Sequence, residues 1–101
     1  MSLEKLARGR PCFLRLPGHC NGNPETTVLC HIRRGGTAGI GMKPPSICAI
    51  PMCSDCHSLY DGRTQDPSYS RTELDAEMLR AHCQWLDYLV KQEIVIVVLA
   101  A

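Results

Sequence analysis

The residues with the most specific chemistry in this chain lie in one short segment, residues 53–61. It holds Cys53 and Cys56 with two residues between them, then His57 and, four residues further on, Asp61. A Cys-x-x-Cys turn directs two thiolates at one ion, as in a zinc knuckle. The segment therefore predicts metal binding.

A closed structural zinc site needs four ligands, so a second pair of thiols has to join the first. Cys12 and Cys20 are the natural pair, because the Pro17-Gly18 turn between them can bring them together. We expect these four cysteines to bind one structural Zn²⁺. His19, beside Cys20, is an alternative to one of the thiols.

Three further cysteines complete the seven in the chain. Cys30, Cys48 and Cys83 fall on predicted apolar faces, where a free cysteine behaves as a small hydrophobic residue. We expect them in the core and not at the metal.

His57 and Asp61 form a second candidate site. Residues four apart on a helix share one face, so both side chains could hold one cation from the same side. Two ligands from one helix leave positions open for water and phosphate, as in a catalytic site. The alternative is an ordinary exposed ion pair.

Length and composition limit the class of protein. With 101 residues and a net charge of +1, the chain is expected to form a single domain, residues 1–101, without the overall positive field of a strongly basic nucleic-acid-binding protein. The cysteine count is odd, and the first residues lack an apolar signal region. These features favour a reduced, cytoplasmic protein that makes no contact with membranes.

The elements that must position these residues follow from the apolar pattern. The β-branched residues of 26–32 predict a strand that ends near His31, and residues 47–50 predict a second strand that ends at Pro51. A glycine-rich loop joins the two. A helix capped by Ser54 or Asp55 is expected to run as far as Gly62.

The last third of the chain predicts a long amphipathic helix over about 67–92, with apolar residues three and four apart. Ser70 and Glu73 form a capping box at its start. The apolar run 93–99 favours a terminal strand, which must be covered within the domain or by a second copy. A homodimer through this helix and strand is therefore expected.

A strand ending in His, a loop, a second strand, and Cys-x-x-Cys-His opening a helix together resemble the HNH, or ββα-metal, nuclease motif. The chain resembles more particularly the small phage and prophage family named "Putative nuclease YbcO". The residues that carry this second likeness are 20–26, 31–33, 43–45, 53–57 and 61–64.

The resemblance implies an α+β fold: a small ββα-metal core, about residues 8–64, cross-linked by the four-cysteine zinc site and followed by the C-terminal helix and strand. It implies that His31 is the general base that deprotonates water, and that His57 binds the catalytic divalent cation, Mg²⁺ or Zn²⁺. Asp61 stands where many members carry another ligand. Cys30 stands immediately before the base, where many HNH enzymes place Asp or His.

The leading hypothesis is a metal-dependent endonuclease that hydrolyses phosphodiester bonds of DNA. In this hypothesis Arg33, Arg34 and Lys43 bind backbone phosphates. The first alternative is a zinc-stabilised module that binds nucleic acid or a phage protein without cutting. The second is a structural oligomer built on the C-terminal helix and strand.

Overall fold

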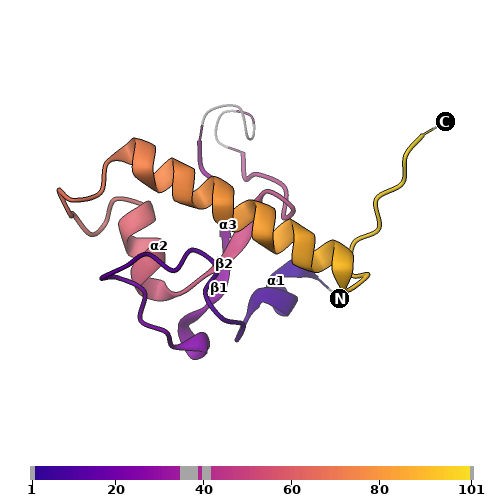
Figure 1. Ribbon diagram of the computed structural model, residues 1–101, viewed down its shortest axis with the longest axis horizontal. Coiled ribbons are helices and arrows are strands. Elements are labelled where there is room, and N and C mark those ends of the chain that lie inside the picture. The colour runs from indigo at the N-terminus through magenta and orange to yellow at the C-terminus, as the bar shows by residue number, and fades with distance from the viewer. Residues whose placement is uncertain (1, 35–38, 40–41, 101) are drawn as a thin grey trace.

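The computed structural model describes residues 2–34, 39 and 42–100. Six elements follow one another: helix α1 (Leu3–Ala7), the 3-10 helix η1 (Pro24–Thr26), strands β1 (Val28–His31) and β2 (Ala49–Met52), and helices α2 (Ser54–Tyr60) and α3 (Arg71–Lys91). The fold is therefore α+β, with a small two-stranded sheet and a long C-terminal helix, as expected (Figure 1).

The two strands pair antiparallel, so that Val28 lies opposite Met52 and His31 lies opposite Ala49. Side chains alternate between the faces of a sheet, which sends Cys30 and Ile50 to one face and His31 and Ala49 to the other. Cys30 and Ile50 belong to the main core, and α1 packs against β1. The register thus separates two neighbouring residues that both have candidate chemistry.

The second strand differs from the prediction, because it begins two residues later and includes Pro51. Proline fits here because its carbonyl points away from β1 and accepts a hydrogen bond of 2.9 Å from the backbone N–H of Phe13. The missing N–H of Pro51 therefore costs the ladder no hydrogen bond.

Helix α2 begins at Ser54, and its N-cap is Cys53 instead of the predicted Ser54 or Asp55. The Cys53 sulfur accepts a hydrogen bond from the backbone N–H of Cys56, which is the work that a capping oxygen usually does. At the other end Gly62 adopts a φ of +82°, the left-handed conformation expected after a helix.

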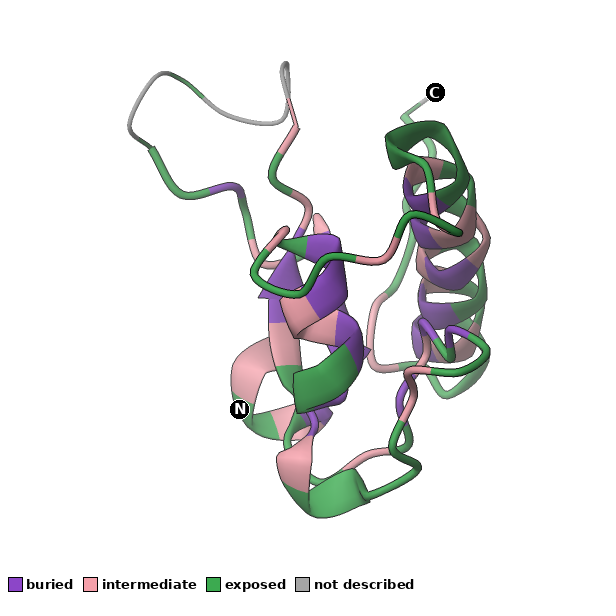
Figure 2. Cartoon of the chain, turned by 90° about the vertical axis from the view of Figure 1, so that its left-hand side faces the viewer, coloured by how far each residue is buried: buried purple, intermediate pink, exposed green. Residues whose placement is uncertain are grey.

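Helix α3 lies across the rest of the domain and contacts β2 (Figure 1). Ser70 caps it by accepting a 3.1 Å hydrogen bond from the backbone N–H of Glu73, which confirms Ser70 as the N-cap; the Glu73 carboxylate in turn accepts from the Ser70 hydroxyl. Its buried residues, including Trp85 and Leu89, recur at helical spacing and face the domain (Figure 2). No helix among the described residues is long and apolar enough to span a membrane.

The prediction of a terminal strand over 93–99 is wrong. Glu93 adopts a φ of +57°, and the backbone N–H groups of Ile94 and Val95 both donate to the carbonyl of Leu89. The chain thus turns back at the end of α3, and Ile94 and Val95 pack against the core. Beyond them no described strand pairs with residues 96–99, and a strand forms only where a neighbour completes its hydrogen bonds.

The side chains of residues 96–99 are between 66% and 89% exposed. Exposed apolar chain favours association, so the expected homodimer stays a prediction.

Ending the chain after Val95 should leave the free energy of unfolding within about 0.5 kcal/mol of the full chain, because the side chains of residues 96–99 contact little of the rest of the domain. Light scattering at increasing concentration should show a dimer for the full chain and a monomer for the shortened one. A full chain that stays monomeric throughout would contradict the prediction.

Candidate functional site

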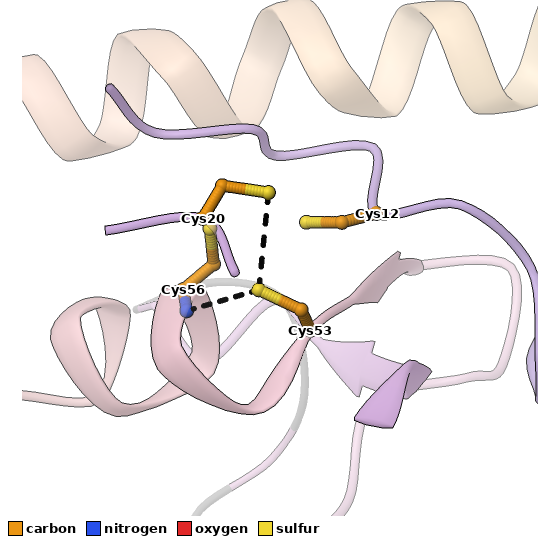
Figure 3. A group of neighbouring side chains, drawn as sticks. All are labelled: Cys12, Cys20, Cys53 and Cys56. Atoms are coloured by element: carbon orange, nitrogen blue, oxygen red, sulfur yellow. Dashed lines mark hydrogen bonds between the residues drawn. The ribbon is translucent and has the colours of Figure 1, made fainter. Parts of the chain in front are cut away.

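The four predicted zinc ligands meet in the structure. Ligand atoms of Cys12, Cys20, Cys53 and Cys56 all lie within 4.8 Å of one another (Figure 3). Cys12 and Cys20 come from the loop before β1, while Cys53 and Cys56 come from the start of α2. The turn at Gly18, with a φ of +80°, brings Cys20 back beside Cys12. The prediction of a four-cysteine cluster that could bind a metal ion such as zinc is confirmed.

Backbone N–H groups point at the sulfur atoms of this cluster. The N–H of Arg15 donates to the Cys12 sulfur at 3.4 Å, and the N–H of Leu16 donates to the Cys56 sulfur at 3.5 Å. Such donors favour the charged thiolate over the thiol. Thiolates, and not thiols, are the metal ligands, so the local backbone prepares the cluster for a cation.

The pKa values of two of the thiols, Cys12 and Cys56, also show that the cluster favours a bound cation. A hydrogen bond from Cys56 lowers the pKa of the Cys12 thiol, while the same contact raises the pKa of Cys56. One thiolate is therefore stabilised by the proton of its neighbour, and further ionisation is opposed by charge and burial. A divalent cation removes that opposition.

The spacing of the sulfur atoms fits zinc. A tetrahedral ion with Zn–S bonds of about 2.3 Å requires sulfur atoms about 3.8 Å apart. The sulfur atoms of Cys20 and Cys53 are 4.0 Å apart. His19, the alternative ligand, is outside the cluster, because its Nε2 lies 2.6 Å from the Asp66 carboxylate.

The remaining cysteines lie outside the cluster. Cys30 is 2% exposed and belongs to the core, as predicted. Cys48 is half-buried, and Cys83 is exposed, so the prediction of a core position is wrong for Cys83. Cys83 misses the core because the buried stripe of α3 passes through Ala81 and Trp85, which leaves it on the outer side.

His31, the predicted general base, is the last residue of β1 and is 8% exposed. Its Nε2 is buried and has no hydrogen-bond partner among the described residues. Burial lowers the pKa of His31, and the positive charges of Lys43 and Arg33 lower it further. The imidazole is therefore neutral at pH 7, and its unpartnered Nε2 is a nitrogen that could accept a proton.

His57 and Asp61, the predicted ligands of the catalytic cation, contact each other. His57 lies in α2, and Asp61 is the C-cap of this helix, one turn further on. Nε2 of His57 lies 2.9 Å from a carboxylate oxygen of Asp61, and Arg63 lies 3.6 Å from the same oxygen. Burial lowers the pKa of His57 although Asp61 opposes the change, so this imidazole is also neutral at pH 7. Within the part of the chain that is described, His31 does not join His57 and Asp61 in a group of side chains that could hold one metal ion.

Cys30 lies near this pair, and its environment keeps it protonated. Burial raises the pKa of the Cys30 thiol to about 12, and the negative charge of Asp61 contributes to the rise. A neutral thiol is a poor metal ligand, so in this state Cys30 does not take the role of the Asp or His that HNH enzymes place at the matching position.

The three predicted phosphate-binding residues have different surroundings. Arg33 and Lys43 are exposed on either side of the loop between the strands, close enough to His31 to lower its pKa. The guanidinium of Arg34 instead contacts Asp75 of α3 at 2.6 Å and lies 4.2 Å above the Tyr60 ring. Two of the three are therefore presented to solvent near His31.

Arg80 also supports the site, although no sequence pattern pointed to it. Its guanidinium donates to the carbonyl groups of Phe13 and Leu14, at 2.9 and 2.5 Å, and so holds the Cys12 loop against α3. The contact joins residues more than sixty positions apart, and a single arginine on a polar helix face carries no local signal of such a role.

We predict that the purified chain holds one zinc ion and that Cys53→Ser loses both the metal and the folded state. Structural zinc contributes on the order of 10 kcal/mol to small domains, so chelation should also unfold the chain. Elemental analysis and thermal unfolding with and without chelator measure both effects. Cys83→Ser is the matched control and should change neither. A full-length Cys53→Ser protein with unchanged unfolding temperature would rule out a structural role for the metal.

Comparison with known proteins agrees with the family resemblance seen in the sequence. The family description "Putative nuclease YbcO" matches residues 1–88. The chain is 49% identical over 86 residues to "Putative nuclease YbcO" of Escherichia coli strain K12 and to "Putative nuclease ybcO" of Enterobacteria phage 82, covering 83% of this chain and 90% of each relative. The solved "Structure of a putative bacteriophage protein from Escherichia coli str. K-12 substr. MG1655" superposes with a TM-score of 0.72 at 36% identity, over 90% of this chain and 99% of that one. With this coverage and identity, the chain belongs to the family named "Putative nuclease YbcO".

Proposed function

We propose that this protein is a metal-dependent endonuclease of the HNH type that hydrolyses phosphodiester bonds of DNA. His31 is the general base, and His57 with Asp61 binds the catalytic cation, Mg²⁺ or Zn²⁺. The observation that carries the proposal is the buried, unpartnered Nε2 of His31 in a neutral imidazole. A buried polar atom without a partner is costly, and a water or substrate group bound there removes the cost.

The arrangement around His31 supports this assignment. His31 ends the first strand, the second strand leads directly to the four-cysteine cluster, and His57 follows that cluster on α2. This is the order of the ββα-metal motif. The two relatives from E. coli and phage 82 are themselves named nucleases, which supports the same class of reaction.

In the proposed mechanism, Nε2 of His31 removes a proton from the water that attacks the phosphorus atom. A general base acts on the attacking water and is not a metal ligand, so His31 does not have to join the contact between His57 and Asp61. When bound, the cation neutralises charge on the scissile phosphate and the leaving oxygen. The imidazole of His57 is neutral and the Asp61 carboxylate is adjacent, which is the state that a cation requires.

Binding of DNA is proposed to use the exposed cations near His31. Arg33 and Lys43 bind backbone phosphates directly, through charge and hydrogen bonds. Arg34 contributes less, because Asp75 already neutralises its charge. Contacts of this kind recognise the backbone and not the base sequence, so cleavage should show little sequence preference.

A second candidate is a zinc-stabilised module that binds nucleic acid or a phage protein without cutting it. The observation that favours it is the direct 2.9 Å contact between His57 and Asp61, because a cation bound by both side chains would have to displace this contact. This candidate predicts salt-sensitive DNA binding that persists in His31→Ala and His57→Ala, with no cleavage in any divalent metal.

We predict that the protein nicks plasmid DNA in Mg²⁺, Mn²⁺, Ni²⁺ or Zn²⁺, and that His31→Ala lowers the rate by about a hundredfold or more. His82→Ala is the matched control, because it also removes an imidazole but has no role in the proposed mechanism. His82 lies on α3, where its Nε2 contacts the carbonyl of Ile47. A base must be unprotonated, so the wild-type rate should fall as the pH drops through the His31 pKa, which lies below 6.5. Equal nicking by His31→Ala and wild type would eliminate His31 as the base.

A separate prediction concerns the cation. His57→Ala should raise the metal concentration needed for half-maximal nicking by about tenfold or more, because a nitrogen ligand is lost. Asp61→Asn should cause a smaller rise, since the amide oxygen can still coordinate. The zinc content of both variants should match that of wild type, which separates this site from the four cysteines. An unchanged metal dependence in His57→Ala would refute the assignment.

A further inference from the structure

A cavity of about 280 Å³ lies on a part of the molecule that the proposed nuclease mechanism does not use. It is formed where the Cys12 loop meets the C-terminal half of α3. Its lining residues are Arg10, Pro11, Cys12, Phe13, Arg15 and Tyr88. The volume is close to the lower limit for small-molecule sites, so it suits a single compact group.

Aromatic rings form the apolar part of the cavity. Phe13 and Tyr88 line it, and their ring centres are 6.3 Å apart. Behind them Trp85 is fully buried, with its ring centre 5.1 Å from Phe13 and 5.7 Å from Tyr88. Tyr88 stacks on Trp85 with 14° between the ring planes, and the guanidinium of Arg10 lies 5.3 Å from the centre of the Tyr88 ring. Phe13 is therefore the lining ring that is left for stacking on a nucleobase.

The charged residues that line the cavity are both cations. Neither Arg10 nor Arg15 pairs with a carboxylate among the described residues. Arg10 is held in place because its guanidinium donates to the carbonyl of Leu6 and to the Tyr88 hydroxyl. Both arginines have further N–H groups that these contacts do not use, since a guanidinium carries five donors.

Arg15 reaches this position at a cost in backbone conformation. Its φ is +48°, in the left-handed region that favours glycine, and its Nη2 donates to the Gln84 side chain on α3 at 2.9 Å. Left-handed backbone at a residue with a long side chain costs about 1 kcal/mol, and such positions cluster at functional sites. In this conformation the backbone N–H of Arg15 donates to the Cys12 sulfur at 3.4 Å, a contact that does not involve the arginine side chain.

We propose that this cavity binds one nucleotide, with its base against Phe13 and its phosphate between Arg10 and Arg15. Aromatic walls and two cations without acidic partners together fit an aromatic ring that bears an anionic group. The nucleotide is either free in solution or the end of a single DNA strand. The site is independent of cleavage, since none of its lining residues belongs to the proposed active site.

Tryptophan fluorescence can measure ligand binding in this chain. Trp85 is the single tryptophan and contacts both ring residues of the cavity. Titration of the zinc-loaded full chain with dAMP should change its fluorescence saturably, and calorimetry should give the same affinity. Deoxyadenosine and inorganic phosphate should each bind at least about tenfold more weakly, because each lacks one half of the ligand. If neither method detects binding of dAMP or of a 5′-phosphorylated hexamer of deoxyadenosine, the proposal is wrong.

The same hexamer distinguishes the two sources of the nucleotide. Tighter binding of the hexamer than of dAMP, weakened by Arg15→Gly, identifies the end of a DNA strand, because Arg33 and Lys43 lie outside the cavity and their share of the binding would survive that change. Equal binding of the two probes identifies a free nucleotide. His31→Ala should bind both probes as wild type does, so loss of nicking and loss of nucleotide binding can be observed separately.

Arg15→Gly is the most informative variant, because glycine adopts a φ of +48° without strain while the whole side chain, guanidinium included, is removed. It should keep the fold and weaken dAMP binding about tenfold, as should Arg10→Ala. Arg8→Ala is the matched control: it removes the same charge from an exposed residue that does not line the cavity. If Arg8→Ala weakened binding as much as Arg15→Gly, general charge attraction would explain the binding and the cavity would not be the site.

Discussion

The convergence of four cysteine sulfur atoms is the constraint on which the rest of this small fold depends. The sheet has only two strands of four residues each, and an isolated hairpin of that size is marginally stable in water. The cysteines join the loop before β1 to the start of α2, so the parts that flank the hairpin are held together at one point. Helix α3 then covers the resulting surface and completes the core (Figure 2).

The cluster also determines where the candidate catalytic residues lie. Cys53 caps α2 through its sulfur, and this fixes the residue at which the helix begins and so the direction of His57. The register of β1 with β2 does the same for His31, because a shift by one residue would exchange it with Cys30. A buried thiol and a buried imidazole thus occupy opposite faces of one strand, and each has its pKa changed by its own surroundings.

The arginines of this chain fall into groups that a charge count cannot distinguish. Arg34 and Arg80 hold loops against the rest of the domain, through Asp75 in one case and backbone carbonyl groups in the other. Arg33 is exposed near His31, while Arg10 and Arg15 line a cavity at the opposite end of the same basic stretch. Since the net charge is only +1, recognition of an anion depends on these local arrangements and not on a general field.

The sequence by itself located both strands, the two later helices and the four cysteines that form the cluster. The Cys-x-x-Cys spacing, the Pro17-Gly18 turn and the Ser70–Glu73 capping box are local signals, and local geometry alone is enough to interpret them. Periodicity similarly located both strands and the long helix to within a few residues.

Tertiary structure decided whatever depends on contacts between distant residues. It placed Pro51 inside a strand because Phe13 bonds its outward carbonyl, and it left residues 96–99 without a partner because no described strand lies beside them. It paired the guanidinium of Arg34 with the carboxylate of Asp75, forty-one residues away, and that of Arg10 with the hydroxyl of Tyr88, seventy-eight residues away. Such pairings have no signature in a single sequence, because the free energy that selects them comes from the packing of the complete chain and not from the preferences of its segments.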